Sequence, residues 1–218
     1  MSSIIDFKNN TIDIDYLGKI MSQASRFPER INDIFESMSY NQFLSKRELI
    51  DTLDNSGIVD ENLNVIIIGS WYGTILVPIL APRVKSVSLY DIDKTTIHIA
   101  RQLYDYKNIE YICKDPTKVS FERFKKPDTL IINTSCEHME SMKELCHTQK
   151  ISVKKRNHKI YLACQSNDMF YIDQHINCVN NMEEFENQFP WNFQILYKKE
   201  IKEERGTRFF IFGYLEEI

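Results

Sequence analysis

The sequence of 218 residues lacks the features that mark several protein classes. No apolar run reaches the roughly 18 residues that a membrane-spanning helix needs. The N-terminal stretch MSSIIDFKNN has neither the basic start nor the apolar core of a signal peptide. No linker rich in Pro, Gly or Ser divides the chain, and the five cysteines form no CxxC pair. An odd number of cysteines argues against a complete disulfide framework. These absences predict a cytoplasmic protein with reduced thiols.

The charge of the chain is nearly balanced. A formal net charge of −4 and a pI near 5.8 give no overall electrostatic footprint for nucleic acid. Hydrophobic residues make up 43% of the sequence, which is enough to bury one substantial core. We therefore expect no membrane partner and no strong nucleic-acid partner, while the oligomeric state is not readable from the sequence.

The first sixty residues contain helical patterns and no strand-like runs. ERINDIFESM and SKRELIDTLDNSG carry apolar residues at spacings of three and four, which is typical of an amphipathic helix. Ser45 is predicted to cap the second helix, and NSG to end it. Residues 1–60 are therefore predicted to form an N-terminal helical cap, and residues 61–218 the main domain.

From Asn64 onwards strand-like runs alternate with helix-compatible segments. The runs are NVIIIG, SVSLYD, IEYICKD, DTLIINTS, KIYLACQS, FQILYKKEI and TRFFIFGYLE, and the helical segments include TTIHIARQLYDY and HMESMKELCHT. Such alternation favours a parallel sheet covered on both faces. The last two runs have no helix between them and predict an antiparallel hairpin around KEERG. The pattern predicts an α/β fold: a Rossmann-like, mainly parallel seven-stranded sheet with a C-terminal hairpin.

Polar residues gather after the strand-like runs, where open α/β sheets bind their ligands. The first run leads into the loop GSWYG. Asp91, at the end of the second run, lies about twenty residues after this loop. That is the spacing at which an acid accepts hydrogen bonds from ribose hydroxyls. A simpler reading is that the glycines only end a strand and that Asp91 or Asp93 caps the next helix. The two features together favour a ligand that carries a ribose.

The segment from Asn64 to Asp115 resembles the core of class I S-adenosylmethionine-dependent methyltransferases. The resemblance is carried by VIIIGSWYG, SLYDIDKTTIHIARQ and IEYICKDPTKV. It implies that Gly69 and Gly73 wrap the methionine part of the cofactor, that Asp91 holds the ribose, and that Asp115 meets the adenine. It further implies a cofactor-binding set that includes Ser70, Trp71 and Tyr72 in the loop and Asn133 and Ser135 after the fourth run. The chain also resembles methyltransferase-like proteins encoded by bacteriophages.

Two positions depart from the pattern of this family. Ile67 stands where the family usually has an acid that orients the amino-acid part of the cofactor, and Trp71 stands where it usually has its second glycine. An indole there would obstruct a pyrophosphate, which disfavours a dinucleotide-dependent enzyme. Two alternatives stay open beside methyl transfer. One is transfer of the aminocarboxypropyl group, as in nicotianamine-synthase-like proteins, and the other is a non-catalytic adenosine-binding module with a filled pocket.

The stretch NTSCEHME places a row of polar and reactive side chains directly after the fourth run. In the family that loop often faces the methyl acceptor, so Glu137 and His138 are candidates for taking its proton. His175 lies in a second polar cluster and is expected to surround the same acceptor. The alternative is a helix N-terminus, with Ser135 as its cap and Glu137 or Glu140 in the first turn. Cys136 is a poor candidate nucleophile because the sequence offers no dedicated group to lower its pKa.

The cysteines and histidines show no ligand spacing of zinc-finger type, so we expect no metal, with a two-His site including Glu137 left open. The leading hypothesis is therefore a methyltransferase that uses S-adenosylmethionine, leaves S-adenosylhomocysteine, and acts on a small molecule or a nucleotide. Catalysis in such an enzyme is mostly positioning of the acceptor in line with the sulfonium methyl group.

Overall fold

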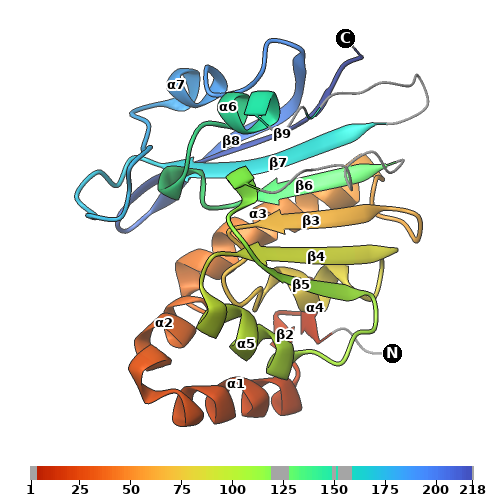
Figure 1. The fold of residues 1–218 in the computed structure, drawn as a ribbon, viewed down its shortest axis with the longest axis vertical. Coiled ribbons are helices and arrows are strands. Elements are labelled where there is room, and N and C mark those ends of the chain that lie inside the picture. Colours follow the sequence, from red (N-terminus) through yellow and green to blue (C-terminus); the bar gives the residue numbers. More distant parts are fainter. Residues whose placement is uncertain (1–3, 119–127, 149–150, 152–158, 218) are drawn as a thin grey trace.

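The computed structural model describes residues 4–118, 128–148, 151 and 159–217. Its main sheet has seven strands (Figure 1). They are β3 (Asn64–Ile68), β4 (Ser86–Asp91), β5 (Ile109–Cys113), β6 (Thr129–Asn133), β7 (Ile160–Asn167), β8 (Phe193–Glu203) and β9 (Gly206–Leu215). Their order across the sheet is β5-β4-β3-β6-β7-β9-β8, and β9 runs antiparallel to both of its neighbours. The Rossmann-like sheet and its C-terminal hairpin are confirmed.

The order of the strands reverses between β3 and β6. From β3 the chain adds β4 and β5 on one side, and it then returns to add β6 and β7 on the other. In open parallel sheets such a reversal leaves a crevice at the carboxyl ends of the two strands, because the connections depart to opposite sides. The fold therefore places a candidate ligand site beyond Ile68 and Asn133.

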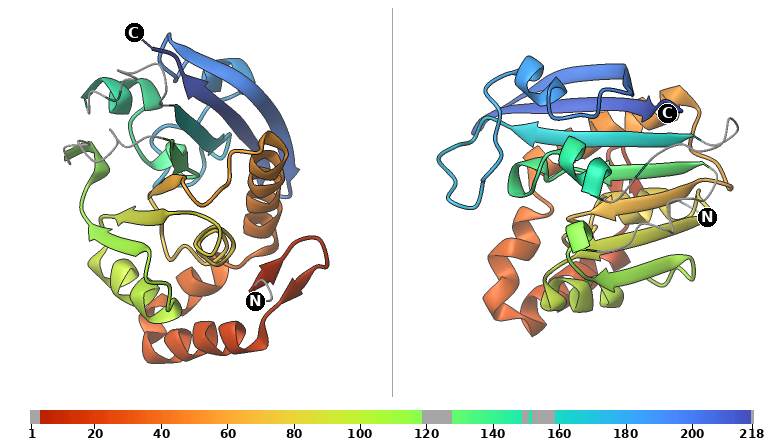
Figure 2. Two further views of the ribbon diagram at one scale, coloured as in Figure 1. Left: turned by 90° about the vertical axis from the view of Figure 1, so that its right-hand side faces the viewer. Right: turned by 45° about the horizontal axis from the view of Figure 1, so that its top comes forward.

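Helices cover both faces of this sheet. They are α1 (Ile14–Arg26), α2 (Ile31–Glu36), α3 (Tyr40–Ser56), α4 (Leu76–Leu80), α5 (Lys94–Leu103), α6 (Met142–Thr148) and α7 (Met182–Glu186). Successive residues of β3 alternate between two cores, because side chains on a strand point to opposite faces. Val65 and Ile67 join the core with α1, α3, α4 and α5, and Ile66 and Ile68 the core with α6 and α7. Figure 2 shows α3 and α6 on opposite sides of the sheet.

The first sixty residues differ in detail from the prediction. A two-stranded hairpin, β1 (Ile5–Asp6) and β2 (Thr11–Ile12), precedes α1, and neither it nor α1 is part of the expectation above. The predicted cap at Ser45 is wrong. Ser45 is buried inside α3, where its hydroxyl donates to the carbonyl of Gln42, and the helix already begins at Tyr40. The predicted end of this helix is confirmed, because Gly57 follows it with a φ of 69°.

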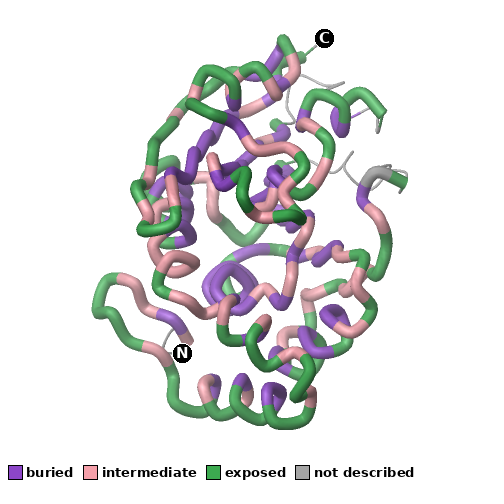
Figure 3. The backbone as a smooth tube through the Cα atoms, turned by 90° about the vertical axis from the view of Figure 1, so that its left-hand side faces the viewer, coloured by how far each residue is buried: buried purple, intermediate pink, exposed green. Residues whose placement is uncertain are grey.

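Helix α1 shows how the N-terminal segment joins the main core. The Asp13 carboxylate caps it by accepting from the backbone N–H of Tyr16, and the buried residues Tyr16, Ile20 and Ala24 recur at a spacing of four. They belong to the core that also contains Leu103 of α5. In Figure 3 the central strands are buried, while the outer turns of the N-terminal segment are exposed. The helices of residues 1–60 thus share a core with the sheet.

The start of the helix after β4 is confirmed, with Asp93 as its cap, whereas the helix after β6 starts later than predicted. Helix α5 begins at Lys94, and the Asp93 carboxylate caps it by accepting from the N–H groups of Thr95 and Thr96. The chain after β6 first makes a single 3-10 turn, η4 (Cys136–His138), and α6 begins only at Met142. Within the part of the chain that the structure describes, none of the helices has the length and apolar character for crossing a membrane.

Candidate active site

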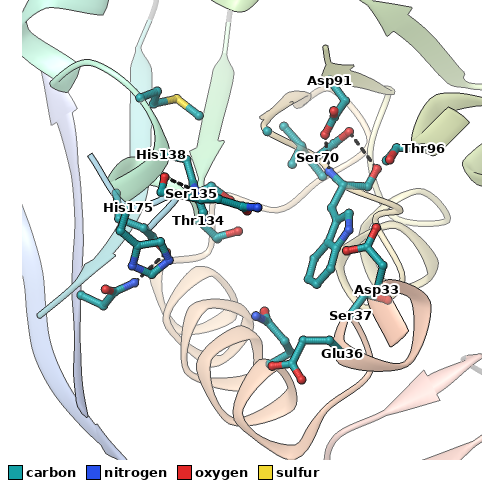
Figure 4. A pocket seen from close by; sticks show the side chains of 18 of the residues that line it. Asp33, Glu36, Ser37, Ser70, Asp91, Thr96, Thr134, Ser135, His138 and His175 are labelled. Atoms are coloured by element: carbon teal, nitrogen blue, oxygen red, sulfur yellow. Dashed lines mark hydrogen bonds between the residues drawn. The ribbon is translucent and has the colours of Figure 1, made fainter. Parts of the chain in front are cut away.

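A cavity of about 800 Å³ opens at the carboxyl ends of β3, β4 and β6. Its other walls come from α2, α3, the segment after β7, and the β8–β9 hairpin. This volume lies within the range of about 300–1,000 Å³ that is usual for small-molecule sites. Figure 4 shows Asp91 and Thr96 on one side of the cavity, His138 and His175 on the opposite side, and Asp33 and Glu36 of α2 near its base.

The loop GSWYG turns the chain sharply between β3 and α4. Gly69, Trp71 and Gly73 have φ values of 57°, 49° and 67°, so the backbone is left-handed at every second residue. A Cβ atom on Gly73 would lie 2.6 Å from Cγ2 of Val77, which explains why this position holds glycine. Trp71 has the same backbone conformation in spite of its side chain, and that side chain lines the cavity.

Asp91 at the end of β4 is tied directly to this loop. Its Oδ2 accepts from the backbone N–H of Trp71 at 2.9 Å, and its Oδ1 accepts from the N–H of Asp93 at 3.0 Å. Burial raises the pKa of the Asp91 carboxyl in spite of these hydrogen bonds. Each carboxylate oxygen can accept a second hydrogen bond, and Asp91 lines the cavity. The site therefore presents a carboxylate that can receive two neighbouring hydroxyl groups.

The N-terminal helices hold the other side of the loop. The phenol of Tyr72 donates to Asp33 at 2.7 Å, and Arg30 pairs with both Asp33 and Asp93. Tyr72 is fully buried and does not line the cavity, unlike Ser70 and Trp71. Its contribution is to fix the loop against α2, which differs from the direct contact that the sequence predicted.

Of the remaining residues predicted to bind the cofactor, some line the cavity and one does not. Asp115 after β5 and Ser135 after β6 line the cavity, and Ile67 contributes an apolar patch to its wall. Asn133 is fully buried and does not line it. Its Oδ1 accepts from the backbone N–H of Ser135 at 3.1 Å, so it shapes the turn after β6.

The three predicted catalytic residues lie together although 37 positions separate His138 from His175. One ring nitrogen of each histidine and a carboxylate oxygen of Glu137 are within 4.8 Å of one another, and the two rings meet edge to face at 4.6 Å. Glu137 is buried, and its Oε1 accepts from Nδ2 of Asn167 at 2.7 Å. Burial lowers the pKa of His175, which favours its neutral form. The group can hold a proton, a polar acceptor or a cation.

Several charged residues of the cavity have no local signal in the sequence. Arg208 of β9 is buried and pairs with Glu203 at 2.8 Å and with Glu137 at 3.6 Å. Lys46 of α3 lines the same region, and burial lowers its pKa to about 7. These side chains come from the first and last segments of the chain, so only the tertiary structure brings them to the strand ends.

Cys136 does not line the cavity, whereas the segment after β7 does. Cys136 is buried, and burial raises the pKa of its thiol, which disfavours the thiolate that a nucleophile needs. The segment after β7 supplies Met169, Ile172 and His175 to the cavity wall.

Comparisons with known proteins agree on the fold. No family model and no curated protein matches the sequence. Among solved structures, the N-methyltransferase NodS from Bradyrhizobium japonicum in complex with S-adenosylhomocysteine aligns over 94% of this chain and 100% of its own, at 14% identity and a TM-score of 0.62. YcgJ from Bacillus subtilis aligns over 79% of this chain and 100% of its own, at 12% identity and a TM-score of 0.60.

A third structure is the magnesium protoporphyrin IX methyltransferase ChlM from Synechocystis with bound S-adenosylmethionine. It aligns over 81% of this chain and 80% of its own, at 11% identity and a TM-score of 0.56. At identities this low, the structural similarity establishes the fold alone. The chain has the Rossmann-like fold of class I S-adenosylmethionine-dependent methyltransferases.

Proposed function

We propose that this protein is an S-adenosylmethionine-dependent methyltransferase whose acceptor is a small molecule or a nucleotide. The observation that carries the proposal is the Asp91 carboxylate, which is hydrogen-bonded to the GSWYG loop and faces a cavity at the switch point of the sheet. A carboxylate beside a left-handed loop suits the paired hydroxyls of a ribose. Solved proteins with the same fold hold S-adenosylmethionine or its product.

The cofactor half of the cavity has a defined set of residues in this proposal. Asp91 accepts from the ribose hydroxyls, Asp115 meets the adenine, and the backbone around Gly69 approaches the methionine part. Tyr72 and Asn133 act indirectly, because they are buried and hold the loop and the turn in place.

The amino-acid end of the cofactor needs a different partner from that of the family pattern. Ile67 supplies only apolar surface to the cavity, so no carboxylate is available at that position. Asp33 and Glu36 of α2 line the cavity near its base, as Figure 4 shows. We assign the binding of the ammonium group to this acidic end of α2.

Glu137, His138 and His175 form the acceptor half in the proposal. His138 and His175 lie across the cavity from Asp91, and Glu137 is grouped with them. Neutral His175 is suited to taking a proton from an acceptor hydroxyl or amine, while the cavity walls hold the acceptor in line with the sulfonium. The polar side chains at this end of the cavity favour an acceptor that carries a polar group.

The two alternative functions gain no support. The filled-pocket module would need the Trp71 indole to occupy the ligand space, whereas Trp71 lines a cavity that remains open. No observation favours aminocarboxypropyl transfer over methyl transfer. The two reactions differ in product, since methyl transfer releases S-adenosylhomocysteine and the other releases methylthioadenosine, and mass spectrometry separates them.

Isothermal titration calorimetry with S-adenosylmethionine and S-adenosylhomocysteine tests the proposal. The Asp91→Asn substitution removes the charge from the hydroxyl acceptor, so both ligands are expected to bind about 1–3 kcal/mol more weakly. Asp105→Asn is the matched control, because the Asp105 side chain is 90% exposed and pairs only with Lys19 among the contacts that the structure gives it. Absence of binding by the unmodified protein at millimolar ligand, or an unchanged dissociation constant in the Asp91 variant, would refute it.

A further inference from the structure

Glu137, His138 and His175 have the composition of a metal site. Two imidazoles and one carboxylate, with further coordination positions left open, are the ligands of catalytic zinc and of other first-row divalent ions. One nitrogen of each ring and one carboxylate oxygen of Glu137 lie within 4.8 Å of one another, whereas the ligands of a tetrahedral zinc ion are about 3.4 Å apart. His138 is exposed, so its ring has space to move towards the other two side chains.

The hydrogen bonds behind the two histidines point to the same conclusion. Nδ1 of His138 lies 3.1 Å from the carbonyl oxygen of Gln174, and Nδ1 of His175 lies 3.1 Å from that of Met169. A carbonyl oxygen only accepts, so each Nδ1 carries the ring proton and each Nε2 keeps a lone pair. Metal-binding histidines are oriented in this way by a carbonyl or carboxylate on their other nitrogen.

One oxygen of the Glu137 carboxylate is hydrogen-bonded, and the other has no partner within the described part of the chain. Its Oε1 accepts from Asn167 at 2.7 Å and faces Arg208 at 3.6 Å. Its Oε2 is buried and has no hydrogen-bond partner among the residues that the structure describes. A buried carboxylate oxygen without a partner is costly, and a cation or a bound proton donor would satisfy it.

Arg208 does not oppose a cation here as strongly as its charge suggests. Its Nε donates to Glu203 at 2.8 Å, so the buried group contains two carboxylates for this guanidinium. Arg208 faces Oε1 of Glu137, which leaves Oε2 as the coordinating atom.

We propose that Nε2 of His138, Nε2 of His175 and Oε2 of Glu137 bind one divalent transition-metal ion of the zinc class. All three residues line the cavity, so the open coordination positions of the ion would face the space between them and Asp91. An ion bound to Nε2 of His175 would take the place of that nitrogen as the group that acts on an oxygen or nitrogen donor of the acceptor. Binding of the ion itself does not require the proposed methyl transfer.

The test is calorimetric titration of the chelator-treated full chain with ZnCl₂ at pH 7.5 and without S-adenosylmethionine. One ion per chain is expected, with binding at least 100-fold weaker in His138→Ala/His175→Ala. His98→Ala/His147→Ala is the matched control, because it removes two exposed histidines that do not belong to the group, and its binding should be unchanged. Co²⁺ provides a second readout, since visible absorption bands report its coordination by the same residues.

Two results would overturn the proposal: no ion bound by the unmodified chain at micromolar Zn²⁺, or equal binding by the double variant. His138→Ala alone covers the case in which the double variant does not fold, because His138 is exposed. Asn167→Ala should weaken Zn²⁺ binding about 10–100-fold by releasing Glu137. Because cofactor binding is titrated on metal-free protein and Zn²⁺ on cofactor-free protein, failure of one proposal is distinguishable from failure of the other.

Discussion

Gly73 gives a sharp prediction because two separate costs meet at one added methyl group. Its φ of 67° is left-handed, and a residue with a Cβ atom loses roughly 1–2 kcal/mol in that conformation. The new Cβ would also lie 2.6 Å from Cγ2 of Val77, which is completely buried and has no free space to enter. Overpacking of this kind costs about 1–3 kcal/mol. Gly73→Ala should therefore lower the free energy of unfolding by about 2–5 kcal/mol.

Urea unfolding at 25 °C, followed by circular dichroism, measures this change. Gly18→Ala is the control: Gly18 lies exposed inside α1, a Cβ there would meet nothing within 4 Å, and alanine should stabilise the helix by about 0.5–1 kcal/mol. Adding Val77→Ala to Gly73→Ala removes the clash and keeps the backbone cost. The double variant should then be about 1–3 kcal/mol more stable than the sum of the single changes predicts. Strict additivity, or a cost of Gly73→Ala below about 1 kcal/mol, would show that the loop relaxes and that the reasoning is wrong.

Two further predictions concern the buried charges of the cavity. Arg208→Met leaves Glu137 and Glu203 buried without their cation, so it should lower the free energy of unfolding in urea by about 3–5 kcal/mol. Arg205→Met, at an exposed pair, should change this free energy by less than about 1 kcal/mol. Equal effects of the two substitutions would contradict the role of burial. The pKa of Lys46 falls to about 7 on folding, so between that value and its unfolded value the unfolded chain binds more protons. Stability should therefore rise with pH above about 7, by at most about 1.4 kcal/mol per unit. Lys46→Met should remove this rise, and the same slope in both proteins would refute the assignment.

The strands of the sheet could be predicted because their sequence pattern is local. The residues from Val65 to Ile68 are buried on both faces, and such apolar runs followed by polar residues are typical of central parallel strands. Their order in the sheet, and hence the reversal between β3 and β6, depends on how the strands pair and not on any one of them. No strand order therefore follows from the sequence alone, and the structure provides it.

The start of α3 could not be read correctly for a physical reason. Ser45 precedes the charged stretch KREL and has the residue type of an N-cap, but its hydroxyl donates to the carbonyl of Gln42 within the helix. A serine in a helix interior satisfies itself in this way, so its presence alone does not mark a boundary. The helix starts at Tyr40 because Ser39 has extended backbone, with a ψ of 159°.

The candidate site was predictable where it depends on strand ends and unpredictable where it depends on packing. Asp91 contacts Trp71 because neighbouring parallel strands end together, so a spacing of twenty residues in sequence becomes a hydrogen bond in space. No comparable rule connects α2 to the loop after β3, since the position of α2 depends on the whole N-terminal segment. Asp33 and Arg30 therefore reach the site without a signal that a sequence pattern could carry.

Trp71 shows what the fold constrains at this loop and what it leaves free. The left-handed backbone is retained at the position where the family usually has glycine, so the constraint acts on the path of the chain. A tryptophan in that conformation carries a strain of roughly 1–3 kcal/mol, which persists only where the surroundings fix it. Here the N–H of Trp71 is held by Asp91, and its ring stacks on Tyr72, which is anchored in turn to Asp33 of α2. The same contacts that fix the candidate ribose acceptor thus hold the indole at the wall of the cavity.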